Sequence, residues 1–190
     1  MPRVVGVLSL QGDFQLHCDA IAACGAEPRQ VRMPEDLAGC EGLILPGGES
    51  TTLGILLRRH GLDQAIAERC RDGMPAWGTC MGMILMAQRV EGRDQFTLSL
   101  LDITIRRNAF GPQVHSFEQE IPVKGFVSPF PAVFIRAPIV TECGPEVESL
   151  AEVEGKVVAV RQGRLLGTAF HPELTADRRV HEYFLSLFGG

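Results

Sequence analysis

Long apolar runs are missing from this sequence, and so is an excess of basic charge. No uninterrupted apolar stretch approaches the roughly 20 residues that a membrane-spanning helix needs. The 18 Lys and Arg residues are outnumbered by 23 Asp and Glu residues, which leaves a formal net charge of -5. A chain of this charge lacks the basic surface that supplies most of the affinity for a nucleic-acid backbone. We therefore expect neither a membrane nor a nucleic acid as a partner.

Cysteine and histidine are present, but not at the spacing of metal ligands. The six cysteines include no CxxC pair and no Cys/His cluster at zinc spacing, so we assign no metal. We expect no secretory leader, because the apolar run from Val4 to Leu10 continues into Gln11 without a cleavage pattern. The thiols are then expected to be reduced, in a cytoplasmic protein. Four histidines are expected to have structural or surface roles: His17, His60, His115 and His181.

The length of 190 residues, 45% of them hydrophobic, suits one domain, which we expect to span residues 1–190. The first half alternates short apolar runs with helical patterns, which is typical of parallel strands joined by crossover helices. Strands are expected at residues 4–10, 28–33, 42–45 and 75–79. Helices are expected to begin at residue 14, to fill residues 51–71 and to span residues 81–90.

The second half changes to β-rich segments punctuated by Gly and Pro. These segments lie at residues 99–106, 114–123, 133–136, 147–153, 156–161 and 165–170. They predict antiparallel additions on one side of the same sheet, followed by a closing helix at residues 177–188. The expected fold class is α/β, with a single domain built on a mixed, mostly parallel sheet flanked by helices.

The segment Gly78–Gly82 (Gly-Thr-Cys-Met-Gly) places Cys80 between a predicted apolar strand and a predicted apolar helix. Glycines two residues before and two residues after a nucleophile permit a sharp turn that lifts its side chain out of the sheet edge. Partial positive charge at a helix N-terminus favours the thiolate form of a cysteine. The pattern predicts a nucleophile elbow, and the alternative is a small buried core thiol.

A second candidate element is His171-Pro172-Glu173, directly after an apolar strand. Proline restricts the backbone on both sides of itself, so the His171 and Glu173 side chains should project to a common side. His171 would then act as the general base, and the Glu173 carboxylate would orient its imidazole. The alternative is a loop histidine beside a solvated glutamate.

The third element is the glycine-rich segment Pro46–Thr52 (Pro-Gly-Gly-Glu-Ser-Thr-Thr), which also follows a strand. The backbone N–H groups of Gly48 and Met81 could bind the oxyanion of a tetrahedral intermediate. The alternative is an ordinary turn before a helix capped by Ser50 or Thr51. A phosphate-binding loop is disfavoured because the lysine of that motif is missing.

These three segments together resemble those of the class I glutamine amidotransferases. More narrowly, the chain is similar over essentially its whole length to the glutaminase subunits of pyridoxal 5'-phosphate synthase. The narrower resemblance also rests on four further segments: Leu10–Gly12, Arg107–Gly111, Ser116–Glu118 and Val133–Pro138. The fold that it implies is flavodoxin-like, in agreement with the strand and helix pattern.

The resemblance implies that Cys80 is the nucleophile and that His171 and Glu173 complete a catalytic triad. It implies glutamine-binding positions at Gly47, Gly48, Glu49, Arg107, Ile135 and Arg136. A guanidinium suits the carboxylate of a free amino acid, although either arginine could equally form a surface or interface ion pair. The chain departs from the family at Met81, where Ala is usual, but the backbone N–H needed for an oxyanion site is retained.

The activity implied by the resemblance is hydrolysis of L-glutamine to L-glutamate and ammonia. The ammonia would pass to a pyridoxal 5'-phosphate synthase subunit in a hetero-oligomer, and no cofactor is implied for this chain. Three alternatives stay open: a glutaminase of another pathway, a non-catalytic domain of the same fold, and a cysteine hydrolase acting on peptides. The segments Arg107–Gly111 and Phe134–Pro138 argue against the first, and the intact Cys80, His171 and Glu173 argue against the second.

Overall fold

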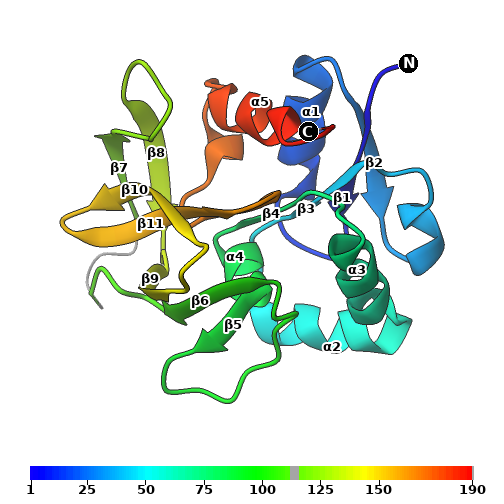
Figure 1. Cartoon of the computed structure of the whole chain (residues 1–190), viewed down its shortest axis with the longest axis horizontal. Helices are drawn as coiled ribbons and strands as arrows, with labels where there is room; N and C mark the ends of the chain where they lie inside the picture. Colours follow the sequence, from blue (N-terminus) through cyan, green and yellow to red (C-terminus); the bar gives the residue numbers. More distant parts are fainter. Residues whose placement is uncertain (112–115, 190) are drawn as a thin grey trace.

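The computed structural model describes residues 1–111 and 116–189. Within this part of the chain, one ten-stranded sheet runs through the molecule with helices on both of its faces (Figure 1). Five strands pair in parallel, in the spatial order β2 (Glu27–Val31), β1 (Val4–Leu8), β3 (Gly42–Leu45), β4 (Ala76–Thr79) and β12 (Leu165–Thr168). This arrangement confirms the predicted α/β fold class.

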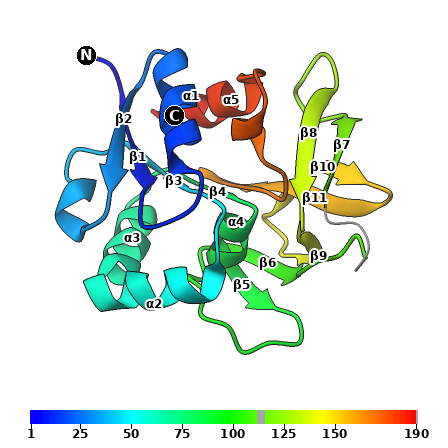
Figure 2. The same cartoon turned by 180° about the vertical axis from the view of Figure 1, so that it is seen from behind.

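Helices cover the two faces of the parallel strands, as Figures 1 and 2 show from opposite sides. One face carries α1 (Phe14–Ala23) and α5 (Arg179–Ser186), and the other carries α2 (Ser50–His60), α3 (Leu62–Arg71) and α4 (Met81–Met86). Two short 3-10 helices, η1 (Pro34–Leu37) and η2 (Pro172–Leu174), lie in connections. The helix predicted over residues 51–71 is two helices, because Gly61 adopts a left-handed φ of 70° and ends α2.

Antiparallel strands extend the sheet beyond β12. They follow in the order β11 (Lys156–Gln162), β9 (Ile139–Cys143), β6 (Leu101–Arg106) and β5 (Ala87–Val90), with β10 (Glu148–Val153) paired to β11. The pairs from β12 to β6 are antiparallel, which confirms the predicted additions, whereas β5 and β6 pair in parallel. The sequence pattern did not predict β9, whose polar residues interrupt its apolar run.

Strands β7 (Ser116–Ile121) and β8 (Phe130–Ile135) correct the prediction that every addition joins one sheet. They pair only with each other among the described strands. The hairpin packs aromatic rings instead, because Phe134 stacks on Phe117 at 4.6 Å and meets Phe170 edge to face at 5.6 Å. The predicted segment 114–123 begins at residues 114 and 115, which lie outside the described residues, as does His115.

The helix predicted over residues 81–90 is wrong in its second half. The helix α4 ends at Met86, Ala87 is extended with ψ of 155°, and β5 begins there and pairs with β6. An all-apolar run fits a buried helix and a buried strand equally well. The pairing with β6 decides between them, and a local pattern does not contain that information.

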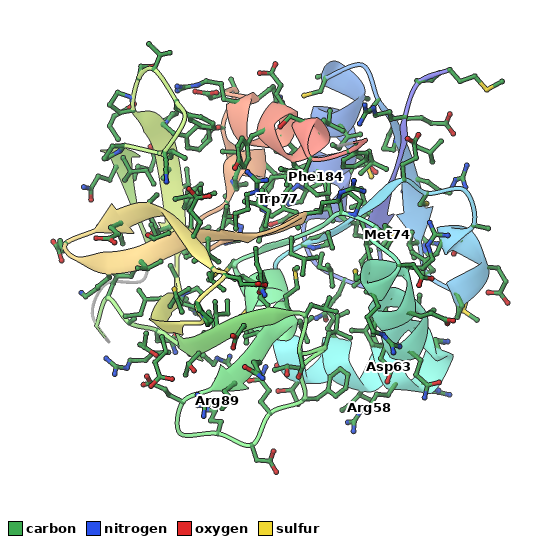
Figure 3. All side chains as sticks on the ribbon, in the orientation of Figure 1. Arg58, Asp63, Met74, Trp77, Arg89 and Phe184 are labelled. Carbon is green, nitrogen blue, oxygen red and sulfur yellow. The ribbon has the colours of Figure 1, made fainter. Side chains whose placement is uncertain are left out.

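The core lies between the parallel strands and their helices. Trp77 of β4 and Phe184 of α5 are fully buried there, with ring centroids 5.6 Å apart, and Figure 3 shows both between the sheet and α5. Because parallel strands end at a common edge, the loops after β1, β3, β4 and β12 converge at one edge. All three candidate elements of the sequence follow strands at this edge.

Candidate active site

Cys80 occupies a sharp turn between β4 and α4. Its backbone has φ of 50° and ψ of -106°, a conformation that costs a non-glycine residue on the order of 1–3 kcal/mol. The flanking glycines make this turn possible. A Cβ at Gly82 would lie 1.8 Å from the Leu45 carbonyl oxygen, and a Cβ at Gly78 would lie 2.4 Å from the Gly82 carbonyl carbon. The close packing of β3, β4 and α4 therefore requires glycine at both positions.

His171 follows β12, and its backbone N–H donates to the Val133 carbonyl at 2.8 Å. Its ring Nδ1 lies 2.7 Å from Glu173 Oε1, so the carboxylate holds the proton on Nδ1 and leaves Nε2 for the thiol. His171 is 7% exposed, Glu173 is 4% exposed and Cys80 is 4% exposed. The structure thus brings the three residues together in a largely water-excluded arrangement.

The electrostatics of His171 are set by opposing effects. Burial disfavours the charged ring, but a hydrogen bond with Cys80, a hydrogen bond with Glu173 and the negative charges of both raise the pKa of His171 to about 10. At neutral pH the ring is therefore an imidazolium. The arrangement can stabilise a neighbouring thiolate and hold a proton ready for a leaving group.

The glycine loop after β3 lies against the same residues. A Cβ at Gly47 would lie 3.0 Å from His171 Cε1 and 3.6 Å from Cys80 Cβ. On its other side, the Gly47 carbonyl oxygen packs against Gly12, where a Cβ would lie 1.8 Å from it. The loop after β1 thereby fixes the position of the Gly47–Gly48 peptide.

Glu49, rather than Ser50 or Thr51, caps helix α2. Its carboxylate accepts hydrogen bonds from the backbone N–H of Thr51 at 3.0 Å and of Thr52 at 2.7 Å. Hydrogen bonds from the Thr52 side chain and from these N–H groups lower the pKa of Glu49 to about 2. Glutamate, unlike aspartate, is not among the preferred N-cap residues, so the expectation of a cap at Ser50 or Thr51 was wrong.

A pocket of about 420 Å³ opens at the Cys80 side chain. Its lining consists of Gly48, Glu49, Cys80, Met81, Ile84, Arg107, Asn108, Ile135, Arg136 and His171. All the sequence-predicted site residues line the pocket except Gly47 and Glu173. These two lie against the pocket-lining residue His171. Arg107 follows β6 and donates to Gln95 Oε1 at 3.0 Å, whereas Ile135 and Arg136 come from the end of β8.

Sequence reasoning missed three groups at this site. Ile84 and Asn108 line the pocket, and His17 of α1 lies behind the triad, 3.4 Å from Glu173 Oε2. Asn108 follows Arg107 in a segment already singled out, so its place could have been found. The signal for His17 was weaker, because its spacing with Phe14 and Ile21 marks a buried helix face without naming the neighbour.

The part of the chain that the structure describes contains neither a metal-binding cluster nor a membrane-spanning helix. No three His, Cys, Asp or Glu side chains there converge in a way that could hold a metal ion. None of the helices there is both long enough and apolar enough to cross a bilayer.

Comparison with known proteins agrees with this geometry. The sequence profile of the SNO glutamine amidotransferase family matches residues 7–189. Pyridoxal 5'-phosphate synthase subunit PdxT of Roseiflexus sp. (strain RS-1) is 54% identical, and the match covers 96% of this chain and 99% of the relative. The protein of the same name from Herpetosiphon aurantiacus is 56% identical, with 96% and 99% covered. A crystal structure of a glutamine amidotransferase superposes with a TM-score of 0.92 at 46% identity, covering 96% of this chain and 97% of that one.

Proposed function

The chain belongs to the SNO glutamine amidotransferase family, and from this premise we propose how its residues hydrolyse L-glutamine to L-glutamate and ammonia. Cys80 is the nucleophile, His171 the proton carrier and Glu173 the residue that orients the imidazole. The observation that carries this assignment is the contact of 2.7 Å between His171 Nδ1 and Glu173 Oε1, at a pocket that Cys80 and His171 both line.

The reaction begins when the Cys80 thiolate attacks the carbon of the glutamine carboxamide. A sulfur–carbon bond forms, and the carbonyl π electrons move to oxygen, where the N–H groups of Gly48 and Met81 stabilise the oxyanion. The intermediate then collapses, the carbon–nitrogen bond breaks, and His171 gives its proton to the departing ammonia. This step leaves a glutamyl thioester on Cys80.

Hydrolysis of the thioester completes the cycle. His171, now neutral, takes a proton from a water molecule as the water oxygen attacks the thioester carbon. The sulfur–carbon bond breaks, L-glutamate leaves and the thiolate–imidazolium pair is restored. Atoms balance as glutamine plus water giving glutamate plus ammonia.

Recognition of glutamine falls to the outer wall of the pocket. The guanidinium groups of Arg107 and Arg136 suit the α-carboxylate, and the Glu49 carboxylate suits the α-ammonium group. The backbone of Gly47, Gly48 and Ile135 completes the binding positions. The Met81 side chain is half-buried and also lines the pocket, so it contacts substrate where the family usually has the smaller Ala.

The partner is a pyridoxal 5'-phosphate synthase subunit, to which this chain passes ammonia within a hetero-oligomer. The names of the relatives support this assignment, since both are described as subunits of that synthase and are matched over 99% of their length. We place the reaction in the cytoplasm and assign residues 1–190 to one glutaminase domain. All six cysteines are free, which agrees with a reducing compartment.

The test is glutamine hydrolysis by Cys80→Ala, measured with and without the synthase subunit. We expect a loss of at least about 10³-fold in turnover, because members of a triad act as a unit. The matched control is Cys143→Ala, since Cys143 is an exposed cysteine of β9 and should leave turnover unchanged. Supplied ammonium should restore pyridoxal 5'-phosphate synthesis in the Cys80→Ala complex.

Two results would contradict the proposal. If Cys80→Ala hydrolyses glutamine at the wild-type rate, Cys80 is not the nucleophile. Hydrolysis of peptide amides in preference to free glutamine would replace the substrate and favour the cysteine hydrolase alternative.

A further inference from the structure

A buried line of polar groups continues from Glu173 away from the pocket. Glu173 Oε1 meets His171, and Glu173 Oε2 lies 3.4 Å from His17 Nε2. His17 Nδ1 in turn lies 3.1 Å from His181 Nε2, and His17 Nε2 also lies 3.3 Å from the Thr79 hydroxyl. The His17 and His181 side chains are 0% exposed.

Aromatic packing holds this line in place. The His17 ring meets Trp77 edge to face with centroids 5.4 Å apart, and the His181 ring meets Trp77 at 4.9 Å. Trp77 and Phe184, labelled in Figure 3, lie in the layer between the sheet and α5 where these rings sit. Two histidines in an apolar core must therefore satisfy each other and the carboxylate.

Hydrogen-bond accounting selects one tautomer of each ring. If His17 carries its proton on Nε2, it donates toward Glu173 Oε2, and its Nδ1 accepts a hydrogen bond from His181 Nε2–H. His181 Nδ1, then an unprotonated acceptor, makes no hydrogen bond, and Glu173 Oε2 makes none either but has the His17 N–H 3.4 Å away. The chain of donors runs in one direction, from His181 through His17 to Glu173.

The opposite tautomer leaves more groups unsatisfied. With the proton on His17 Nδ1, His17 would donate to His181, and the His181 proton would move to its partnerless Nδ1. His17 Nε2 would then accept from the Thr79 hydroxyl, and Glu173 Oε2, which makes no hydrogen bond among the described residues, would lose the N–H that lies 3.4 Å from it. A buried carboxylate oxygen and a buried N–H without partners cost more than one buried acceptor nitrogen.

Both rings are neutral in this line. Burial, followed by the charges of His181 and His171, lowers the pKa of His17 well below its ordinary value, and burial with the charge of Arg178 lowers that of His181 to about 3. A neutral His17 donates one hydrogen bond without adding a charge that would compete with His171 for Glu173. It can hold the carboxylate while leaving the imidazolium as its single cationic partner.

We propose that His17 is a positioning residue for the catalytic carboxylate: its neutral N–H faces Glu173 Oε2 at 3.4 Å and thereby keeps Oε1 aimed at His171. His181 fixes the tautomer in which His17 can do so. The inference rests on the triad of the proposed function and adds to it a residue from a helix that does not reach the pocket. A carboxylate between two donors cannot rotate away from the imidazole, so the orientation of His171 toward Cys80 is maintained through turnover.

The experiment compares three substitutions of His17 in the chain assembled with its synthase subunit. His17→Leu removes the donor, His17→Asn keeps a polar group too short to reach Glu173, and His17→Gln keeps an N–H near the position of Nε2. We expect Leu and Asn to lower kcat on the order of 10- to 100-fold, as for other hydrogen bonds that orient histidine, with KM within about two-fold. Gln should recover most of kcat.

A double-mutant cycle with Glu173→Gln separates positioning from packing. If His17 acts through Glu173, His17→Leu combined with Glu173→Gln is no slower than Glu173→Gln alone. Ile21→Val is the control for packing, because Ile21 is fully buried on the same helix as His17. It should lower the unfolding midpoint and leave kcat unchanged.

The outcomes distinguish this inference from the proposed function. If Cys80→Ala is inactive and His17→Leu is fully active, the inference is overturned and the proposed function stands. The inference is also overturned if the kcat losses of His17→Leu and Glu173→Gln multiply in the double variant. Cys80→Ala active overturns the proposed function and this inference with it. If His17→Leu does not fold, the comparison of Asn with Gln decides, and equal kcat values in those two variants count against positioning.

Discussion

The parallel strands and the antiparallel strands, β8 of the separate hairpin included, contribute different residues to the lining of the pocket, which we call its two walls. The parallel strands end at Cys80, His171 and the Gly47–Gly48 peptide, so the reacting groups are placed by short turns at a rigid edge. The antiparallel part supplies Arg107 and Arg136 from the ends of β6 and β8. In the proposed function the reacting groups thus come from the parallel part, whereas both arginines assigned to the glutamine carboxylate come from antiparallel strands.

The two walls also differ in burial. Cys80, His171 and Glu173 are each at most 7% exposed, whereas Arg136 is exposed at the rim. A substitution at the buried residues forces the close-packed backbone around them to move. A substitution at the exposed residues leaves a space that solvent fills. Substitutions in the parallel part should therefore lower turnover, and substitutions in the antiparallel part should weaken glutamine binding.

Gly82→Ala tests the parallel wall most severely. The new Cβ would lie 1.8 Å from the Leu45 carbonyl oxygen, so α4 must move away from β3 and take Cys80 and the Met81 N–H with it. We expect turnover to fall by about 10²- to 10³-fold, the usual effect of losing one oxyanion donor. We also expect unfolding in urea to show a loss of about 1–3 kcal/mol, as for other overpacked cores.

Gly92→Ala is the matched control in the antiparallel part. Gly92 has φ of 67°, and no atom lies within 4 Å of a Cβ built there, so only local strain is added. This variant should lose stability on the order of 1 kcal/mol and keep its turnover. The contrast between the walls fails if Gly92→Ala slows hydrolysis as much as Gly82→Ala does.

The parallel part was predictable because its sequence signals are local. The apolar run of β3 is bounded by Gly42 and by the glycine loop, and the predicted strand matches residue for residue. The elbow glycines were predicted to permit a sharp turn, and the packing around Gly78 and Gly82 shows the contacts that demand it. In these segments the backbone conformation requires the same residue types that the sequence shows, so the local pattern predicts the structure.

The remaining features depend on partners far away in sequence. The strand β5 exists because β6 pairs with it, β7 and β8 leave the main sheet because their aromatic residues pack on Phe170, and His17 meets Glu173 across 156 positions of sequence. Local periodicity cannot report such pairings. Recognition of the family supplied the pocket residues of the antiparallel part, which periodicity alone would not have selected.

Arg136→Ala tests the recognition wall. Removing a guanidinium that binds the glutamine carboxylate should cost about 1.5–3 kcal/mol of binding, which corresponds to a rise in KM of roughly 10- to 150-fold. The value of kcat should change by less than about three-fold, because Arg136 does not touch the triad. Steady-state kinetics of glutamine hydrolysis in the presence of the synthase subunit measures both constants.

Arg106→Ala controls for the loss of a surface charge. Arg106 is an exposed residue of β6 whose Nε binds Glu91 at 2.7 Å, and it does not line the pocket. Its removal should leave KM unchanged. An Arg136→Ala variant that loses kcat and keeps KM would place Arg136 in the chemistry and break the division between the walls.

The smallest effect concerns the pH dependence of thiol reactivity. The pKa of His171 is raised to about 10, so its ring stays protonated below that pH and loses its charge as the pH rises through 10. The imidazolium therefore remains beside the Cys80 sulfur throughout pH 7 to 9. Alkylation of Cys80 by limiting iodoacetamide, followed by peptide mapping, should change by less than about three-fold over this range.

Cys143 in the antiparallel part supplies the opposite case within the same sample. Burial and the charges of Asp102 and Glu152 raise the pKa of Cys143, so its thiolate fraction and its labelling rate should climb about ten-fold per pH unit from pH 7 to 9. In His171→Asn the imidazolium is gone, and Cys80 should then be alkylated more slowly at pH 7 than in the wild-type chain. A steep rise in the labelling rate of Cys80 with pH in the wild-type chain would mean that His171 does not stabilise the thiolate. The turn between β4 and α4 would then be the source of the reactivity of Cys80.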